Sequence, residues 1–405
     1  MDWETKRIKD VFSFSKGLSI TKEDLVENGV PVISYGQIHS KQNKGVKIDD
    51  SLIRFVGEEY LKSGEKSLTN KHDFLFADTS EDFEGCGNNV YVDRDMTLFA
   101  GYHTIILRNK KPQDCRYFAY QFNSDDWRTQ IRKATCGIKV YSITQKTLSN
   151  ISLLVPPESI QKKISDFLDV KTQNIDSRIE ILEKKKERYL ILRKAIISEN
   201  VNNNKRWNSV RLKDCLYEPL KYGANATGIE YDEKLPRYIR ITDIDEDGKL
   251  RNDDIQSLPL EIANEYILND GDILLARSGA TAGKSFLYKE KYGKASYAGY
   301  LIKASLNKSC LPQFFYYYTQ SIEYDNWKNK NIIQATIQNL AADKYNYLSF
   351  GLPTTEEQER IVRYLDKKTS AIDSIVEKIT KEIDSLKTYR RALINEAVTG
   401  KLNIE

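Results

Sequence analysis

One helical pattern occurs twice in this chain and constrains the rest of it. When Pro156 is placed on Pro353, residues 156–201 align with residues 353–398 without a gap. Identities recur along the whole alignment: Gln161 with Gln358, Leu168–Asp169 with Leu365–Asp366, Lys171–Thr172 with Lys368–Thr369, and Ile175–Asp176–Ser177 with Ile372–Asp373–Ser374. A gap-free match of this length indicates a duplication within the chain.

Each copy predicts one long helix. A proline precedes each copy, and Glu158 or Glu356 supplies an acidic first turn. About forty residues at ~1.5 Å per residue make a rod of roughly 60 Å. Apolar residues recur at heptad spacing, as in the seam of a coiled coil: Leu168, Ile175, Leu182, Tyr189 and Ile196, then Leu365, Ile372, Ile379, Leu386 and Leu393. Because both copies share this register, we predict a coiled coil within the chain and not two unrelated surface helices. We predict antiparallel pairing, because parallel pairing would crowd the segments that precede the two helices at one end.

The segments ahead of the two helices are also related, but more loosely. WETKRIKD at 3–10 corresponds to WNSVRLKD at 207–214, DFLFADTS at 73–80 to DILLARSG at 272–279, and Asp125 with Trp127 to Asp325 with Trp327. The offset changes from match to match, so insertions have accumulated in the loops of a shared scaffold. We therefore predict a globular domain at 1–155, a helix at 156–204, a second globular domain at 205–352 and a second helix at 353–405.

Both globular segments have the pattern of mixed α and β structure. Short apolar or alternating runs predict strands: VPVISYGQI, FLFA, VYV and HTIILRN, then RYIRITDI, DILLAR, FLY and YLIKASL. Each segment also predicts one helix that opens at Pro112 or Pro312. We expect the aromatic side chains of these helices, such as Tyr117 and Phe315, to lie in the core. The predicted fold class is α+β, with two similar mixed α/β domains separated by two long helices.

Composition excludes several classes of protein. The net charge of +4 over 405 residues neither requires nor excludes a nucleic-acid partner. The five cysteines form no CxxC pair, which fits a reducing compartment and gives no zinc site. The charged start, MDWETKRIKD, is not a signal peptide, and no apolar run is long enough to span a membrane. We therefore expect a soluble cytoplasmic protein.

The motifs of catalysis are missing. GATAGKS at 279–285 resembles a phosphate-binding loop but has three residues between its glycines where that motif has four. No GxGxxG unit supports dinucleotide or S-adenosylmethionine binding, and no Asn/Asp-Pro-Pro-Tyr/Phe tetrapeptide supports amino-group methylation. The three histidines, His39, His72 and His103, lack the spacing of a metal site or a catalytic triad. These absences favour a binding protein over an enzyme.

Two related domains that alternate with two related helices are the arrangement of a known family. Each helix opens with a proline, a glutamate and then Gln161 or Gln358. The second helix ends INEAVTGKL, and the domain before it contains YIRITDI and GDILLARSGATAGKS. Over its whole length the chain resembles the specificity subunit of a type I restriction–modification system.

The resemblance implies a non-catalytic protein with two target-recognition domains, each reading one half of a split, asymmetric site in double-stranded DNA. It implies that the paired helices set the separation of the half-sites and dock two methyltransferase subunits, which motor–nuclease subunits then join. S-adenosylmethionine would be bound by the partner methyltransferase. This chain itself would bind no cofactor and no metal.

Loops rich in cationic and amide side chains suit DNA phosphates and base edges. Arg277 is suited to a guanine edge and Lys284 to a phosphate. The candidates in the second domain are Arg240, Thr242, Asp243, Arg277, Ser278, Gly279, Thr281, Lys284, Thr336 and Gln338. Their first-domain counterparts by position are Ser34, Tyr35, Gln37, His39, Thr79, Ser80, Lys139 and Tyr141.

The first domain departs from the second at one of these loops. Asp78 stands where Arg277 stands and is followed by TSEDFEGCGN. Carboxylates repel phosphate but accept a hydrogen bond from cytosine N4, so we expect the two half-sites to differ. Two alternatives remain at this point: a coiled-coil scaffold without a DNA role, and a self-sufficient DNA methyltransferase, which the missing motifs disfavour.

Overall fold

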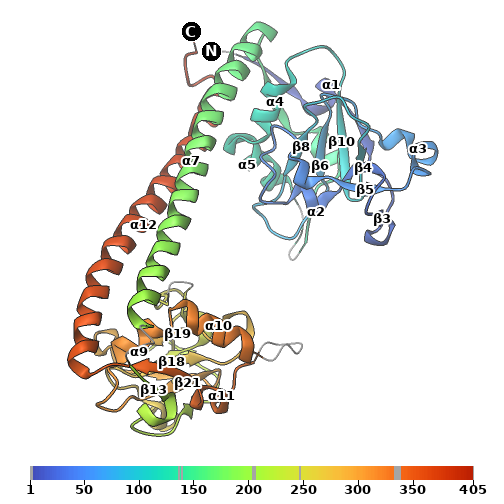
Figure 1. Cartoon of the computed structure of the whole chain (residues 1–405). Coiled ribbons are helices and arrows are strands. Elements are labelled where there is room, and N and C mark those ends of the chain that lie inside the picture. The colour runs from blue at the N-terminus through green and yellow to red at the C-terminus, as the bar shows by residue number, and fades with distance from the viewer. Residues whose placement is uncertain are drawn as a thin grey trace. The chain divides into compact units, whose positions relative to one another are not determined.

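The computed structural model of the chain describes residues 3–135, 137, 140–202, 207–245, 248–332 and 339–404. The chain divides into two compact units, Met1–Leu182 with Lys381–Glu405, and Glu183–Thr380. Each unit holds one globular domain together with part of each long helix (Figure 1). No helix in the described part of the chain is both long and apolar enough to cross a membrane.

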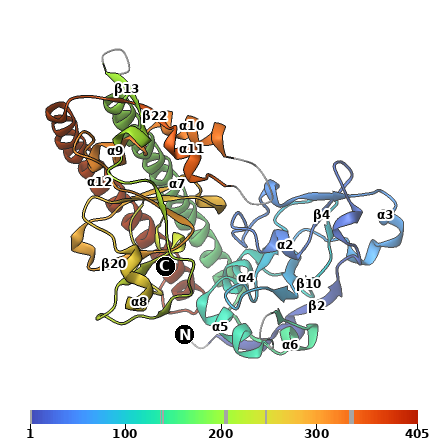
Figure 2. The ribbon, with the colours of Figure 1, turned by 90° about the horizontal axis from the view of Figure 1, so that it is seen from below.

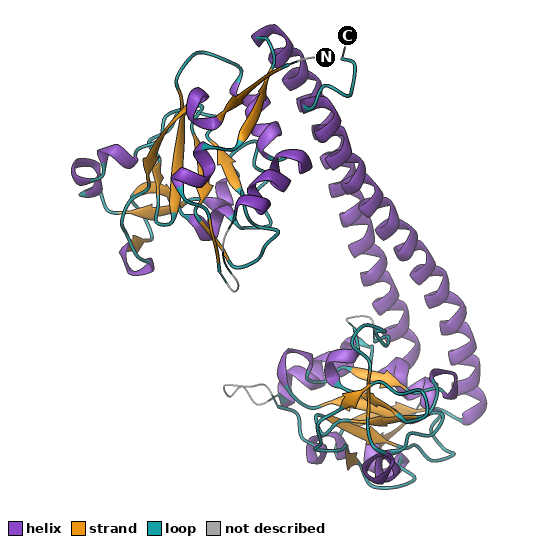
Figure 3. Ribbon diagram, turned by 180° about the vertical axis from the view of Figure 1, so that it is seen from behind, coloured by secondary structure: helices purple, strands orange, loops and turns teal. Residues whose placement is uncertain are grey.

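The two long helices, α7 (Glu158–Val201) and α12 (Thr355–Val398), pack against each other antiparallel, as the sequence predicts (Figure 3). In the first unit, Arg390 of α12 forms an ion pair with Asp176 of α7, in which Nε lies 2.9 Å from Oδ1 and Nη2 donates to Oδ2 over 3.3 Å. In the second unit, Arg193 of α7 donates to Asp373 of α12 over 2.8 Å. A later position on α7 therefore meets an earlier one on α12.

The heptad positions are turned away from solvent along both helices. Tyr189, Ile196 and Leu386 are half-buried, and the other members are buried: Leu168, Ile175, Leu182, Leu365, Ile372, Ile379 and Leu393. Near the C-terminal end of α7, burial moves to the next residue, Ile197, which joins the core of the second domain. A straight α-helix drifts by about 20° per heptad, so the apolar stripe rotates toward the domain.

The first domain is built on two four-stranded sheets, with strand orders β2-β10-β6-β8 and β3-β5-β4-β9. Only β4 and β9 pair parallel among these described strands. Two short pairs, β1-β12 and β11-β7, complete the domain. The strands are β1 (Glu4–Arg7), β2 (Phe12–Lys16), β3 (Leu25–Val26), β4 (Val30–Ile33), β5 (Arg54–Val56), β6 (Phe74–Ala77), β7 (Thr79–Ser80), β8 (Asn89–Tyr91), β9 (Phe99–Ala100), β10 (Thr104–Asn109), β11 (Tyr141–Ser142) and β12 (Ser152–Val155). The helices are α1 (Ile8–Val11), α2 (Tyr35–Ile38), α3 (Tyr60–Ser63), α4 (Cys115–Phe122), α5 (Asp125–Ala134) and α6 (Gln145–Ser149).

The second domain repeats this topology, with orders β14-β21-β18-β19 and β15-β17-β16-β20 and the pair β13-β22. β16 and β20 pair parallel, as β4 and β9 do. The strands are β13 (Asn208–Arg211), β14 (Lys221–Tyr222), β15 (Ile229–Glu230), β16 (Arg237–Ile239), β17 (Gln256–Ser257), β18 (Ile273–Ala276), β19 (Ser285–Leu287), β20 (Ala295–Tyr297), β21 (Leu301–Ala304) and β22 (Ser349–Leu352). The helices are α8 (Leu260–Ala263), α9 (Pro312–Tyr318), α10 (Ile322–Asn331) and α11 (Ala342–Asn346). The predicted mixed α/β class of both domains is confirmed.

The first strand of each domain pairs with its last strand, directly before the long helix begins. Glu4 lies opposite Val155 in the first domain, and Asn208 lies opposite Leu352 in the second. The polypeptide therefore enters and leaves each domain side by side.

The prediction of one helix after Pro112 and one after Pro312 is wrong, because each domain has two helices there. The Ser124 hydroxyl accepts a hydrogen bond from the Trp127 amide, and the Ser321 hydroxyl accepts one from the Tyr324 amide. Each serine thus caps a new helix, α5 or α10. The matching caps pair Trp127 with Tyr324, three residues away from the sequence-based match to Trp327.

Each domain is fastened to its own long helix by the same three side chains. The Tyr120 hydroxyl donates to Asp169 (2.7 Å) and lies 3.2 Å from the Thr172 hydroxyl. The Tyr317 hydroxyl makes the same pair of contacts, at 2.6 Å and 3.2 Å. Their partners are Asp366 and Thr369, which correspond to the first pair in the repeat. The aromatic residues of α4 and α9 are otherwise in the core, as expected.

Candidate nucleic-acid interface

The predicted site residues begin where two equivalent strands end, β4 in the first domain and β16 in the second. After β4, the Ser34 amide donates to Oε1 of Gln37 over 3.1 Å. After β16, the Arg240 amide donates to Oδ2 of Asp243 over 2.8 Å. The same cap follows both strands, so Ser34 corresponds to Arg240 and Gln37 to Asp243 (Figure 2 labels β4 and α2).

Arg240 and Asp243 form a charged pair at this strand end. The Arg240 guanidinium donates to Asp243 Oδ1 from Nη2 (2.7 Å) and to the Asp254 carbonyl (2.6 Å). The hydrogen bond that Arg240 donates to Asp243 is the largest of the effects that raise the pKa of Arg240, which stays cationic. The Asp243 carboxylate is buried and satisfied, whereas Thr242 beside it is exposed.

The next candidates, Asp78 and Arg277, directly follow a second pair of equivalent strands, β6 and β18. The backbone amide of Asp78 donates to the carbonyl of His103 (3.0 Å), and the amide of Arg277 donates to the carbonyl of Tyr300 (3.0 Å). The carbonyls of Asp78 and Arg277 then accept from Ile143 (2.8 Å) and Leu340 (2.7 Å). Asp78 therefore occupies the position of Arg277, as the sequence alignment has it, and His103 occupies that of Tyr300.

Arg277 is held in place by an aromatic ring. Its guanidinium carbon lies 4.9 Å from the centroid of the Tyr222 ring, a cation–π contact. Ser278 pairs with Asn339 in a backbone bridge. The Arg277 Nε and the Asn339 Oδ1 are both buried and lack hydrogen-bond partners among the described residues. Buried polar atoms normally have partners, so these two atoms retain unused hydrogen-bonding capacity beside the loop.

The loop after Arg277 leaves its backbone open. Gly279 has φ +73°, and a Cβ there would meet nothing within 4 Å, so another molecule can approach closely. Thr281 is half-buried in the same loop. Lys284 is half-exposed, and its ammonium has no ion-pair partner in the part of the chain that the structure describes.

The corresponding loop of the first domain is closed by its own contacts. His103 Nδ1 lies 3.1 Å from Asp78 Oδ1, and the Thr79 hydroxyl donates to the same oxygen over 2.8 Å. The Tyr35 ring meets the His103 ring edge-on, with centroids 5.4 Å apart. Asp78 is therefore paired with an exposed imidazole and does not stand alone.

His39 connects α2 to β7 by a chain of hydrogen bonds. Its Nε2 donates to the Thr79 carbonyl (2.8 Å), so its Nδ1 accepts from the Asn88 amide (3.0 Å). Arg128 donates to the other end of the Asn88 amide over 2.7 Å. Burial lowers the pKa of Arg128 to about 10, which still leaves it cationic at neutral pH. These contacts assign His39 a positioning role within the loop cluster.

The remaining first-domain candidates meet at β7 and β11. Ser80 pairs with Tyr141 and Thr79 with Ser142 in this two-stranded ladder. The Tyr141 ring lies against Phe83, with centroids 5.5 Å apart. Lys139, Thr336 and Gln338 lie outside the described residues.

Comparisons with known proteins decide the family. A family model described as the type I restriction modification DNA specificity domain matches residues 1–188 and again residues 204–385. The chain belongs to this family. It is a DNA specificity subunit of a type I restriction–modification system, with two target-recognition domains.

Relatives match the specificity subunit over its whole length. The specificity subunit of the type I restriction enzyme StySPI from Salmonella potsdam is 21% identical over 424 residues, which cover 100% of this chain and 90% of that protein. The EcoKI specificity subunit from Escherichia coli strain K12 is 20% identical over 430 residues, with the same coverage. One chain from a structural study of assembly and conformational transition in a type I system has a TM-score of 0.71 at 17% identity. It covers 99% of this chain and 98% of its own length, which shows a shared fold.

Specificity subunits of this family are non-catalytic recognition subunits. Sequence reasoning missed some of the residues that surround the recognition loops: Tyr222, Tyr300, His103 and Arg128. Tyr222 and Tyr300 are exposed tyrosines far from Arg277 in sequence, and only strand pairing brings them to it. His103 was considered only as a metal or triad residue, although its place beside β10 matches that of Tyr300.

Proposed function

We propose that each target-recognition domain reads one half of a bipartite, asymmetric site in double-stranded DNA. The observation that supports this is the chemistry at corresponding positions of the two domains. Ser34 in the first domain corresponds to Arg240 in the second, Asp78 corresponds to Arg277, and His103 corresponds to Tyr300. A shared scaffold with different donors and acceptors at the same strand ends suits two different half-sites.

Arg277 is the candidate for direct base readout in the second domain. A guanidinium can donate two parallel hydrogen bonds to the O6 and N7 atoms of guanine. The contact with the Tyr222 ring already restricts the orientation of the Arg277 guanidinium, so less conformational entropy is lost on binding. Lys284 would neutralise a phosphate, and Gly279 would let the backbone approach the duplex. Arg240, Thr242, Ser278, Thr281, Thr336 and Gln338 complete the proposed surface, and the buried Asp243 would position Arg240.

In the first domain, Asp78 and His103 would lie at the base edges. A carboxylate accepts from cytosine N4, and an imidazole either donates or accepts according to its partner. The proposed surface also includes Ser34, Tyr35, Gln37, Thr79, Ser80, Lys139 and Tyr141, and His39 would position the loop that carries them.

The two long helices would fix the separation of the half-sites. They span residues 158–201 and 355–398 without a break, and side chains on them fasten each domain at Tyr120 and Tyr317. We place the functional boundaries at 1–155, 156–204, 205–352 and 353–405. The repeated helices would dock two methyltransferase subunits, which carry S-adenosylmethionine, and motor–nuclease subunits would join these. The site of action is expected to be the cytoplasm.

Domain replacement tests the proposal. Residues 205–352 are exchanged for the corresponding domain of another specificity subunit, and the chain is expressed with its methyltransferase. Methylation-sensitive sequencing of the host genome should then show one half of the modified sequence changed and the other half retained. Replacement of residues 3–155 is the matched control and should change the opposite half. Simultaneous change of both halves in either hybrid would contradict independent reading.

A further inference from the structure

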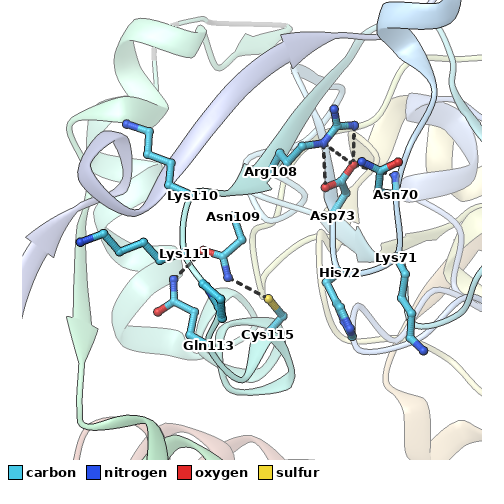
Figure 4. A pocket seen from close by; sticks show the side chains of 11 residues that line it. Asn70, Lys71, His72, Asp73, Arg108, Asn109, Lys110, Lys111, Gln113 and Cys115 are labelled. Atoms are coloured by element: carbon cyan, nitrogen blue, oxygen red, sulfur yellow. Dashed lines mark hydrogen bonds and ion pairs between the residues drawn. The ribbon is translucent and has the colours of Figure 1, made fainter.

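A pocket in the first domain lies at the sheet end remote from the recognition loops. Asp73 stands at the start of β6, whereas Asp78 follows its end, and Arg108 lies near the end of the antiparallel neighbour β10. The pocket has a volume of about 400 Å³ and is formed by the turn before β6, the end of β10 and the segment leading into α4. Figure 4 shows Lys110 and Lys111 on one side of it and Lys71 and His72 on the other.

Four cationic side chains line this pocket: Lys71, Arg108, Lys110 and Lys111. Its one lining carboxylate, Asp73, is buried and accepts from Arg108 over 2.8 Å, so its charge is already matched. Lys71 also faces Asp95, but at 3.4 Å on the exposed rim. The pocket therefore keeps an excess of positive charge.

The same region of the second domain keeps only one of these cations, Lys308, which corresponds to Lys111. The Asn70 amide donates to Asp73 over 2.8 Å, and the Asn269 amide donates to Asp272 over 2.7 Å, so the two turns correspond residue by residue. Lys71 and His72 thus stand where the second domain has Asp270 and Gly271. By strand register, Arg108 and Lys110 stand where it has Ser305 and Asn307. The fold does not require Lys71, Arg108 or Lys110, because the second domain forms without a cation at these three positions.

His72 holds a backbone conformation that suits glycine. Its φ is +76°, and that of Gly271 in the equivalent turn is +89°. Residues with a Cβ adopt this region at a cost in energy. The His72 ring stacks on Tyr91, and its Nδ1 lies 2.6 Å from the Tyr91 hydroxyl. Burial raises the pKa of Tyr91, so its hydroxyl stays protonated and can donate to Nδ1, leaving the His72 Nε2 as a donor.

We propose that this pocket binds a phosphate group, carried either by a free nucleotide or by a nucleic-acid strand. Lys71, Lys111 and the His72 imidazole supply charge and N–H donors for the phosphate oxygens, whereas the Lys110 ammonium donates to the Lys9 carbonyl and contributes its charge. Beside them, Gln113 donates to Asn109 over 2.6 Å and Asn109 lies 3.1 Å from Cys115 Sγ, which gives a polar floor for the rest of the ligand. A cavity of this size is comparable with small-molecule sites. The proposal is independent of DNA reading by the loops at the other sheet end.

The three histidines make the test direct, because His72 reports this pocket and His39 and His103 report the recognition loops. The full chain is labelled at its histidine rings and titrated with inorganic phosphate, with adenosine monophosphate and with a duplex of unrelated sequence. We expect the His72 resonance to move with phosphate. Saturation by the nucleotide at lower concentration than by the duplex assigns a nucleotide, and the reverse order assigns a strand. An unmoved His72 resonance in all three titrations overturns the proposal. A duplex that carries the target site tests the recognition loops separately, through His39 and His103.

The second domain supplies a variant that should fold. Lys71→Asp combined with His72→Gly copies the turn of the second domain, and calorimetry should show phosphate or nucleotide bound at least about tenfold more weakly. Lys111→Asp keeps His72 as the spectroscopic reporter and should weaken its response in the same way. Lys62→Asp, on exposed α3, is the matched control for net charge and should bind as the parent does. Equal weakening by Lys62→Asp would reduce the effect to net charge and overturn the site.

Discussion

Arg193 Nε lies 2.8 Å from Asp373 Oδ1, and this ion pair is repeated elsewhere in the chain. Its copy joins Arg390 to Asp176 over 2.9 Å. Residue 193 corresponds to 390, and 176 to 373, at the same offset that aligns Pro156 with Pro353. Each unit therefore has its own ion pair between α7 and α12, in which the arginine side chain is less exposed than its aspartate.

Removal of either arginine should destabilise the helix pair to a similar extent. We expect Arg193→Ala and Arg390→Ala each to lower the free energy of unfolding by about 1–2 kcal/mol, since each arginine is largely buried while its aspartate keeps contact with water. Urea denaturation measures the loss, and double-mutant cycles with Asp373→Ala and Asp176→Ala isolate the pairs. Arg178→Ala, whose pair with Glu382 is exposed, should cost less than about 0.5 kcal/mol. An equal cost at Arg178 would contradict the role of burial.

Lengthening both helices should lengthen the DNA site. One heptad inserted between Leu182 and Tyr189, and one between Ile379 and Leu386, preserves the seam and adds ~10.5 Å to each helix. At about 3.4 Å per base pair, the half-sites should separate by roughly three pairs while both are still read. Methylation-sensitive sequencing gives the spacing. A four-residue insertion in one helix alone should break the register and abolish assembly. An unchanged spacing after the paired insertion would exclude the helices as the ruler.

Substitution of Arg277 and substitution of Lys284 should affect DNA binding in different ways. Arg277→Ala should relax one base position and cost about 1–3 kcal/mol on the target, because a bidentate guanine contact is lost. Lys284→Ala should weaken binding to all sequences. It should also reduce the slope of log K against log salt concentration by about one. Binding is measured with the methyltransferase complex at several salt concentrations. An unchanged salt slope for Lys284→Ala would remove this lysine from the interface.

Low pH should weaken one attachment of the second domain to α7. Burial raises the pKa of Asp325, but hydrogen bonds from Lys194 and Lys328 outweigh burial and lower it below the model-compound value of 3.8. A depressed carboxylate pKa stabilises the fold above the unfolded value and loses that effect as the pH falls through the folded value. We expect Lys194→Ala to cost about 1 kcal/mol at pH 7 and less near pH 3. Urea midpoints at both pH values test this, with exposed Lys330→Ala as the control. A cost that stays constant with pH would contradict the pairing.

The architecture could be predicted because the duplication is visible in the residues themselves. The shared heptad register of the two helices predicts that they pair. The apolar stripe that includes Ile175 and the one that includes Ile372 are both stabilised by burial away from water. The single helix expected after Pro112 was a wrong prediction for a local reason. The apolar spacing continues through Ser124, but the serine hydroxyl caps a new helix there, and periodicity does not detect a cap inside an apolar run.

The candidate loops could be proposed from sequence, but the contacts within them could not. Arg277 stood out beside glycines, yet the ring that positions it, Tyr222, is 55 residues earlier (277 − 222) and reaches it only through the pairing of β14, β21 and β18. His39 is predicted by position alone, and position does not reveal that Thr79 and Asn88 occupy both of its ring nitrogens. Contacts of this kind depend on strand register, which the loop sequences themselves do not contain.

The pairing of β1 with β12, and of β13 with β22, has a consequence for inheritance. Because each domain begins and ends at neighbouring backbone positions, its coding segment can be exchanged by recombination at two short flanking stretches without disturbing the helices. A whole domain can then be replaced in one step, while the two long helices, which align without a gap, stay unchanged. A chain of this kind could in this way acquire a new specificity without passing through an intermediate in which the helix pair is disrupted.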